Sequence, residues 1–195
     1  MSKKKKPITA AELMAQLNAD KDFVAKRALE EEERQKRAAE WHEAEKPLVE
    51  ELRKAGFEVG SAWDLVNTAV PYEKALPILL NHLQEAYPDR VREGIARALA
   101  VPQAKFGWSV LIDLYRNEKG RDAKDGLAVA IAAISDDELI EDVVSLARDA
   151  RHGPSRVLLL RALRRSADPR ARGALKELRT DPELKKEIEV ILRRL

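Results

Sequence analysis

Apolar residues recur with helical spacing in the last two thirds of the chain, and one such pattern occurs four times. PDRVREGIARALA, residues 88–100, is followed at offsets of 32 and 64 by GRDAKDGLAVAIA and HGPSRVLLLRALR, and then, after a shorter step of 29, by DPELKKEIEVILRR. Each copy has apolar or small residues at i, i+4, i+7 and i+8, which is one face of an α-helix. The four sets are Val91/Ile95/Ala98/Leu99, Ala123/Leu127/Ala130/Ile131, Ser155/Leu159/Ala162/Leu163 and Leu184/Ile188/Ile191/Leu192.

A second helical pattern precedes each copy. Its apolar pairs are Leu80/Leu83, Leu111/Leu114, Val143/Leu146 and Leu175/Leu178. Each unit is therefore predicted to be two antiparallel helices with one apolar face apiece. A single pair cannot bury that face, so the units are expected to stack into an α-solenoid.

This pattern resembles the HEAT and HEAT-like repeat family, whose second helix typically begins Asp-Pro-x-Val-Arg. The resemblance is carried by PDRVREGIARALA and DPELKKEIEVILRR and covers residues 72–195. It implies an all-α fold but little about function, because such scaffolds serve many partners. It also implies a structural role for a basic residue that recurs in every copy, which in this family bonds an acid of the neighbouring unit. Those residues are Arg92, Lys124, Arg156 and Lys185.

Residues 47–71 are predicted to form a degenerate first unit. PLVEELRKAG is typical of a helix closed by Gly56, and SAWDLVN supplies a partner helix with Ser61 as its N-cap and Asp64 at the capping-box position. The repeat domain then spans 47–195. The predicted fold is an all-α, HEAT-like α-solenoid of about five antiparallel helix pairs with an N-terminal helical extension.

That extension has two parts, residues 1–19 and 20–46. In the first, Thr9 and Glu12 suit a capping box for a short helix. MSKKKKP is predicted to be a disordered, solubilising tail, with nucleic-acid binding through backbone phosphates as the alternative. The second is predicted to be one long charged helix ending at Pro47, which either projects or lies along the repeats. Its expected stabilising pairs are Glu30/Arg34, Glu32/Lys36 and Glu33/Arg37. It has no heptad pattern, so we expect a monomer.

Charge and composition narrow the function classes. Lys and Arg number 36 and Asp and Glu 34, which leaves a net charge of only +2 and no overall field toward nucleic acid or membrane. The chain has no cysteine, and its longest apolar run, Leu127–Ile134, is far shorter than the ~20 residues of a membrane span. We therefore expect a cytoplasmic protein without membrane contact.

Motifs for catalysis, cofactor binding and metal ligation are absent from the sequence, so no enzyme and no cofactor is predicted. The three histidines, His42, His82 and His152, are isolated from one another. The acids of SDDELIED are interpreted as the first turn of a helix capped by Ser135, where the helix dipole favours negative charge, rather than as a cation site.

One short segment also resembles the HEAT-like alkylpurine DNA glycosylases. SAWDLVN is similar to their Trp-Asp-x-Val-Asp stretch, which implies a base-binding role for Trp63, but Asn67 replaces the final acid. An amide lacks the negative charge that would stabilise an oxocarbenium-like transition state. The sequence thus favours a packing role for Trp63 and an inactive relative at most.

The strongest functional signal is a basic segment near the C-terminus. The segment from Arg151 to Arg179 contains nine basic residues and two acids, which gives it a local charge of +7. Helical spacing places four residues opposite the core, in a predicted concave groove: Arg97, Val129, Arg161 and Val190. The predicted partner-binding residues are Arg97, Arg161, Arg164, Arg165 and Arg194. We expect a scaffold, adaptor or inhibitor that binds a protein partner with an acidic surface, with a nucleic-acid binder as the alternative.

Overall fold

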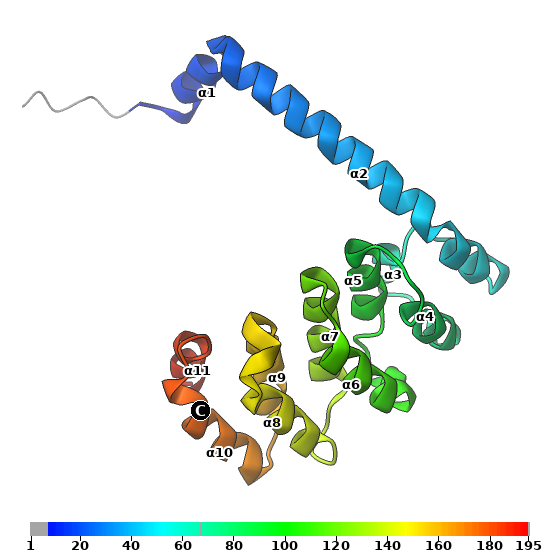
Figure 1. Ribbon diagram of the computed structural model, residues 1–195, viewed down its shortest axis with the longest axis vertical. Coiled ribbons are helices and arrows are strands. Elements are labelled where there is room, and N and C mark those ends of the chain that lie inside the picture. The colour runs from blue at the N-terminus through cyan, green and yellow to red at the C-terminus, as the bar shows by residue number, and fades with distance from the viewer. Residues whose placement is uncertain (1–7, 67, 195) are drawn as a thin grey trace, which may run out of the picture. The chain divides into compact units, whose positions relative to one another are not determined.

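All regular structure in residues 8–66 and 68–194, the part that the computed structural model describes, is helical, without a strand (Figure 1). The prediction of an all-α protein is confirmed. The lysine-rich start of the chain, 1–7, and Asn67 lie outside the described residues. The α-helices are α1 (Ala10–Ala19), α2 (Lys21–Lys54), α3 (Trp63–Val66), α4 (Leu76–Leu83), α5 (Asp89–Ala98), α6 (Trp108–Asn117), α7 (Arg121–Ile134), α8 (Ile140–Arg148), α9 (Arg156–Arg165), α10 (Pro169–Glu177) and α11 (Lys185–Leu192). Short 3₁₀ helices are η1 (Glu73–Ala75), η2 (Pro102–Gly107), η3 (Ala150–Ser155) and η4 (Leu178–Thr180).

Contacts divide the chain into two units, residues 1–43 and 44–195. In the first unit, α1 begins with the predicted capping box: Thr9 Oγ1 accepts from the backbone N–H of Glu12 at 3.2 Å, and Glu12 Oε2 accepts from the N–H of Thr9 at 2.9 Å. The ion pairs formed along this part of α2 are Lys26–Glu30 and Glu31–Arg34. They differ from the three predicted pairs, because exposed charged side chains have several neighbours of nearly equal energy.

The predicted end of the charged helix at Pro47 is wrong, because α2 continues through Pro47 to Lys54. A proline inside a helix costs about 3 kcal/mol, since it removes a backbone hydrogen bond and crowds the preceding turn. Directly after it, however, Leu48, Val49 and Leu52 are buried. Each buried aliphatic side chain contributes about 1.5–3 kcal/mol, so the burial outweighs the cost of the proline.

Helices of the second unit pack on their neighbours in the chain and on the next helix but one. Contacts join α4 to α5, α6 to α7, α8 to α9 and α10 to α11, and they also join α5 to α7, α7 to α9, and α9 to α11. The four sets of repeated apolar positions form the core between these helices, and all of them except Leu192 are buried. The predicted burial pattern is therefore confirmed.

Polar links connect consecutive helix pairs. The carboxylate of Asp89, at the start of α5, accepts from the backbone N–H groups of Asp122 and Ala123 at 3.0 and 2.8 Å, and so caps α7. The helices α5 and α7 approach closely at Gly126, where a Cβ atom would lie 2.8 Å from the carbonyl oxygen of Glu93. This close approach leaves no room for a side chain at position 126.

The recurring basic residue has the expected structural role in two of its four copies. Arg92 pairs with Glu118, and Arg156 pairs with Asp181 and Glu183. The prediction is wrong for Lys124, which donates to the carbonyl oxygen of Glu118 at 3.3 Å and lies 5.0 Å from the ring centroid of Tyr115. It is also wrong for Lys185, which is exposed and has no acidic partner in the described part of the chain.

None of the described helices is both long enough and apolar enough to cross a membrane.

Candidate functional site

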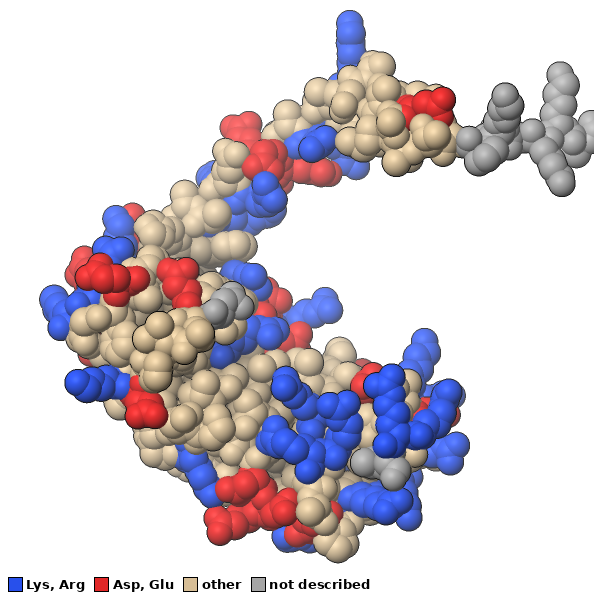
Figure 2. Space-filling view, turned by 180° about the vertical axis from the view of Figure 1, so that it is seen from behind, with Lys and Arg blue, Asp and Glu red and all other residues tan. Residues whose placement is uncertain are grey.

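A cavity of about 280 Å³ lies between α7, α9 and α11. It is lined by Val129, Ala132, Val157, Leu158, Leu160, Arg161, Arg164, Glu187 and Ile191, and is called the α9 groove below. Two of its residues, Val129 and Arg161, are among the four that the sequence predicted to face a groove. Its floor is apolar and its rim carries two arginines and one glutamate. Lys and Arg side chains gather around this C-terminal end of the second unit (Figure 2).

Arg161 and Arg164 are the two cations of the α9 groove. Both are exposed, and within the described residues neither guanidinium has a hydrogen-bond or ion-pair partner. α9 places them on its outer face because Leu159, Ala162 and Leu163 occupy the buried face. Two arginines three residues apart on one helix repel each other, and Glu187, the acid of the lining, forms no ion pair with either of them. The pair is therefore available to a ligand.

The other predicted site residues do not line the α9 groove. Arg165 instead donates to the carbonyl oxygens of Ala132 and Ser135 at 2.8 and 2.7 Å, where α7 ends. Carbonyl groups at a helix C-terminus lack intrahelical donors, so a guanidinium satisfies them. Arg165 thus has a structural role that the sequence did not indicate.

Arg97 is held on its own helix by an acid. Its Nε donates to Glu93 at 2.7 Å, and Arg90 pairs with the same carboxylate. Glu93 is buried between these two arginines. Arg194, at the end of α11, is exposed and outside the groove. Of the five predicted residues, the structure brings together Arg161 and Arg164.

The basic segment 151–179 is less positive in the fold than in the sequence. Several of its arginines are paired: Arg151 with Asp149, Arg156 with Asp181 and Glu183, and Arg170 with Asp168 and Glu141. Four of these acids lie outside the segment, which is why a count within it missed them. Arg172, Lys176 and Arg179 remain exposed and have no partner among the described residues.

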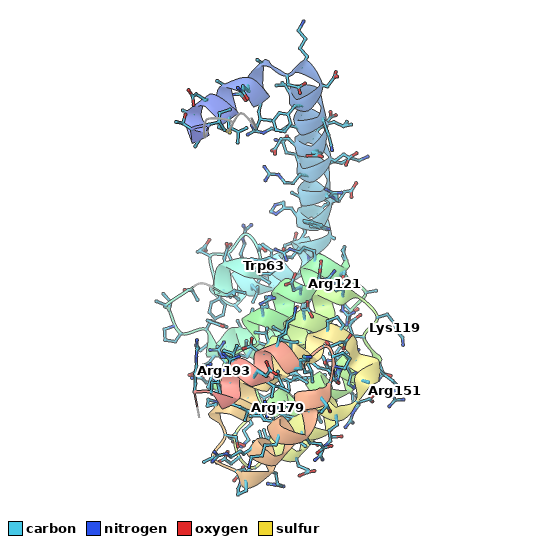
Figure 3. All side chains as sticks on the ribbon, turned by 90° about the vertical axis from the view of Figure 1, so that its left-hand side faces the viewer. Trp63, Lys119, Arg121, Arg151, Arg179 and Arg193 are labelled. Atoms are coloured by element: carbon cyan, nitrogen blue, oxygen red, sulfur yellow. The ribbon has the colours of Figure 1, made fainter. Side chains whose placement is uncertain are left out.

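Trp63, labelled in Figure 3, is half-buried and packs against α5 of the second unit. The guanidinium of Arg90 lies 4.2 Å from the centroid of its ring, and a Cβ at Gly94 would lie 2.5 Å from its indole nitrogen. The ring is thus covered by Arg90 and seated against α5, which agrees with the predicted packing role. Asn67, the other residue of this resemblance, lies outside the described residues.

The turn before Trp63 is fixed by a buried carboxylate. Ser61 Oγ accepts from the backbone N–H of Trp63 at 3.2 Å, and Asp64 accepts from the N–H of Ser61 at 3.2 Å, so the predicted cap is confirmed. Glu45, which is buried, accepts from Ser61 Oγ at 2.9 Å and from the N–H of Ala62 at 2.6 Å. Glu45 is a feature that the sequence pattern did not indicate, because its partners are 16 and 17 residues away.

The predicted N-cap at Ser135 is wrong. Ser135 donates its hydroxyl to the carbonyl of Ala132 at 3.4 Å, and the carboxylate of Asp136 instead accepts from the N–H groups of Glu138 and Leu139. The acids of this stretch have partners on other elements: Lys105 for Asp136, Trp108 for Asp142 and Arg170 for Glu141. No cluster of potential metal ligands is found among the described residues.

The chain matches no protein-family model, and comparisons with curated proteins and with solved structures also found no match. The α9 groove therefore has to be interpreted from its own geometry.

Proposed function

We propose that the chain is a non-enzymatic protein-binding scaffold, built as a HEAT-like α-solenoid, that holds a partner protein with an acidic surface in the α9 groove. A scaffold of this kind acts as an adaptor, an assembly factor or an inhibitor of its partner. The proposal has one part that concerns the architecture and one that concerns the binding surface.

The architecture is supported by contacts that repeat in the order of the sequence pattern. The second helices of the four repeated helix pairs are α5, α7, α9 and α11. They contact one another in succession, and each also contacts the helix before it. The degenerate helix pair predicted for residues 47–71 corresponds to the end of α2 together with α3, and α3 contacts α5. Side chains at the start of one second helix bond the next unit, as Asp89 and Arg156 do. These features are typical of stacked helical pairs.

The observation that carries the binding proposal is that Arg161 and Arg164 have no partner among the residues that the structure describes, although most of the nearby arginines do. They stand beside the exposed edges of Val157 and Leu158. Arginine next to apolar side chains is typical of protein interfaces, where guanidinium groups bind carboxylates in a fork and apolar contacts supply the affinity. A partner with acidic residues beside apolar ones complements this surface.

Nucleic acid is the less suitable partner for this groove. Single-stranded binding uses aromatic side chains on which bases stack, and none of the residues lining the α9 groove is aromatic. Trp63, the residue that suggested a likeness to DNA glycosylases, is covered by Arg90. A duplex could still bind through phosphates alone, and the experiment below includes that outcome.

The test compares two pairs of arginines of equal charge. Arg161→Glu with Arg164→Glu reverses the groove, and Arg172→Glu with Arg179→Glu makes the same charge change outside it, at exposed residues without partners. Immobilised wild-type protein and both variants are incubated with nuclease-treated lysate of the native cells, and the retained proteins are compared. We expect the groove variant to lose proteins that the wild type and the control variant retain. Thermal melts should agree for all three, because exposed substitutions usually change stability by less than about 0.5 kcal/mol.

Two results would contradict the proposal. If the groove variant retains the same proteins as the wild type, the α9 groove is not the binding surface. The second result has two parts: the protein captures others only from lysate that has not been treated with nuclease, and it binds duplex DNA. If the logarithm of the DNA-binding constant also falls with the logarithm of salt concentration by about 0.9 for each phosphate contacted, the nucleic-acid alternative is correct.

A further inference from the structure

A second cavity, of about 640 Å³, lies where the ends of α6 and α8 meet the start of α7 and η3. Its lining comprises Arg116, Asn117, Glu118, Lys119, Lys124, Ser145, Leu146, Asp149, Arg151 and His152. Four of these carry a fixed positive charge and two a negative one. Lys119 and Arg151 extend from the same side of the second unit (Figure 3). The α9 groove shares no residue with this lining, so the two sites can be tested separately.

Both acids of the lining are already neutralised by arginines. Glu118 forms an ion pair with Arg92, and its other oxygen accepts from the backbone N–H groups of Lys119 and Gly120, both at 2.8 Å. Asp149 accepts from Arg151 on both oxygens, from Nε at 2.9 Å on Oδ1 and from Nη2 at 2.6 Å on Oδ2. Each acid of the lining thus has an arginine partner, whereas Lys119 and Lys124 form no ion pair within the described residues.

Lys124 is a half-buried cation without a carboxylate partner. Its ammonium group donates to the carbonyl oxygen of Glu118 at 3.3 Å and lies 5.0 Å from the centroid of the Tyr115 ring. Burial lowers the pKa of Lys124, and the charge of Lys119 lowers it further, against the opposite effect of the Glu118 carboxylate. Only one of the three N–H groups of Lys124 has a hydrogen-bond acceptor among the described residues.

His152 is the fifth basic group of the lining, and its side chain is buried. Its ring packs on Tyr115 with the centroids 4.8 Å apart, and Nε2 lies 3.7 Å from Asp149 Oδ2, too far for a hydrogen bond. Neither ring nitrogen has a hydrogen-bond partner in the described part of the chain. Burial lowers the pKa of His152, as do Lys124, Arg151 and Arg116, whereas Asp149 raises it. These groups together face the imidazole with excess positive charge.

We infer that this cavity binds a phosphate dianion, either inorganic phosphate or the phosphate of a small organic ester, through Lys124 and Lys119, with Arg116 and His152 beside them. Lysine is a common phosphate ligand because its ammonium group donates up to three hydrogen bonds to a concentrated negative charge. A dianion would place that charge beside Lys119 and Lys124, which have no ion-pair partner among the described residues, whereas Arg116 lies 3.7 Å from Asp113 and can shift between that acid and the ligand. The cavity is within the range of small-molecule sites, so it has room for an organic group beyond the phosphate.

His152 provides a direct readout, because an anion bound beside an imidazole favours its charged form. In the full chain, NMR titration of the three histidine rings should show that inorganic phosphate raises the pKa of His152 by about one unit relative to sodium chloride at equal ionic strength. His42 and His82, outside the cavity, serve as internal controls and should not shift. If phosphate leaves the pKa of His152 unchanged, as it does those of the two control histidines, the inference is overturned.

Substitution of the lysines tests the site by a second measurement. Lys124→Met should abolish the shift at His152 and weaken phosphate binding in calorimetry at least tenfold, and Lys119→Gln, at an exposed residue, should weaken it without touching the core. Lys185→Met is the matched control, because Lys185 is exposed and occupies the same position in the last sequence copy. Equal loss in the control would mean diffuse attraction to the surface and would also overturn the inference. If glycerol 3-phosphate binds more tightly than inorganic phosphate, the site is assigned to an organic ester. If the two bind equally, it is assigned to phosphate itself. Glycerol alone is expected to have no effect.

Discussion

Arg156 is the residue on which a stability prediction can be worked out most fully. Its side chain is almost completely buried, with 1% exposed. The guanidinium donates to the carbonyl oxygens of Gly153 and Ala147 at 3.0 and 3.2 Å, to Asp181 at 2.8 Å and to Glu183 at 2.7 Å. Both acids lie in the four residues before α11, so this one side chain, which belongs to α9, holds the start of the last helix to α9. We predict that Arg156→Met destabilises the protein strongly.

The size of the effect follows from the bonds that methionine cannot make. Methionine keeps most of the aliphatic stem, so the loss concerns the guanidinium. Each buried hydrogen bond to a carbonyl contributes about 0.5–1.5 kcal/mol, and the bonds to Asp181, which are charge-assisted, contribute about 1.5–3 kcal/mol. Glu183 is substantially exposed and adds little. The sum is about 3–5 kcal/mol, which corresponds to a fall in Tm of about 6–20 °C for a chain of this size.

The assay is urea unfolding followed by circular dichroism, with Arg170→Met as the matched control. Arg170 also pairs with two carboxylates, those of Asp168 and Glu141, but is about half exposed. Burial is thus the main difference between the two arginines, and exposed ion pairs contribute little to stability. If Arg156→Met unfolds at the same urea concentration as Arg170→Met, the assignment of Arg156 as a buried anchor is wrong.

The same variant has a pH signature. The hydrogen bond from Arg156 holds the pKa of Asp181 below its usual value, so this carboxylate stabilises the fold at any pH above the ordinary aspartate pKa of about 3.9. That contribution is lost as the pH falls through the lowered pKa of the folded state. The difference in unfolding free energy between the wild type and Arg156→Met should therefore be constant near neutral pH and shrink below about pH 4.

Two further predictions each compare a pair of positions with opposite expected outcomes. Arg165→Glu should lower the melting temperature, because it removes the donors to the carbonyl groups at the end of α7 and adds a repelling charge, whereas Arg164→Glu should leave it unchanged; equal melting temperatures would refute the anchoring role. Gly126→Ala should destabilise the protein by about 1–3 kcal/mol, because its Cβ would meet backbone of α5 that cannot move aside. Gly173→Ala, in an exposed helical site with open space around it, should instead stabilise by about 0.5–1 kcal/mol, and urea unfolding measures both.

The parts of the fold that could be predicted from the sequence are those set by burial. The second helices begin within a few residues of the predicted positions because a row of apolar residues such as Val91, Ile95 and Leu99 has only one face to bury. The continuation of α2 through Pro47 could not be predicted in this way. It depends on how deeply the following residues are buried by elements far along the chain, which local pattern does not reveal.

The site was predicted less completely, because a charged residue is defined by its partners. Arg161 and Arg165 are one turn apart and equivalent in the helical pattern, yet one is unpartnered and the other bonds the end of α7. Arg151 counted as part of a positive segment although Asp149, two residues before it, neutralises it. Helical spacing gives the direction in which a long side chain leaves the backbone, but not the group that its end reaches.

The bonds of Asp89 to the start of α7 have a consequence for the order in which the chain is synthesised. Asp89 emerges from the ribosome more than 30 residues before the backbone N–H groups that it caps. The N-terminal end of α7, which lacks intrahelical acceptors for its first N–H groups, therefore meets a carboxylate that is already in place. The capping group is thus synthesised before the helix that it caps: Asp89 of α5 supplies the acceptor, and the first N–H groups of α7 donate to it. A fragment truncated after α5 keeps the capping carboxylate, whereas in one that begins after α5 the N-terminus of α7 lacks the bonds from Asp89.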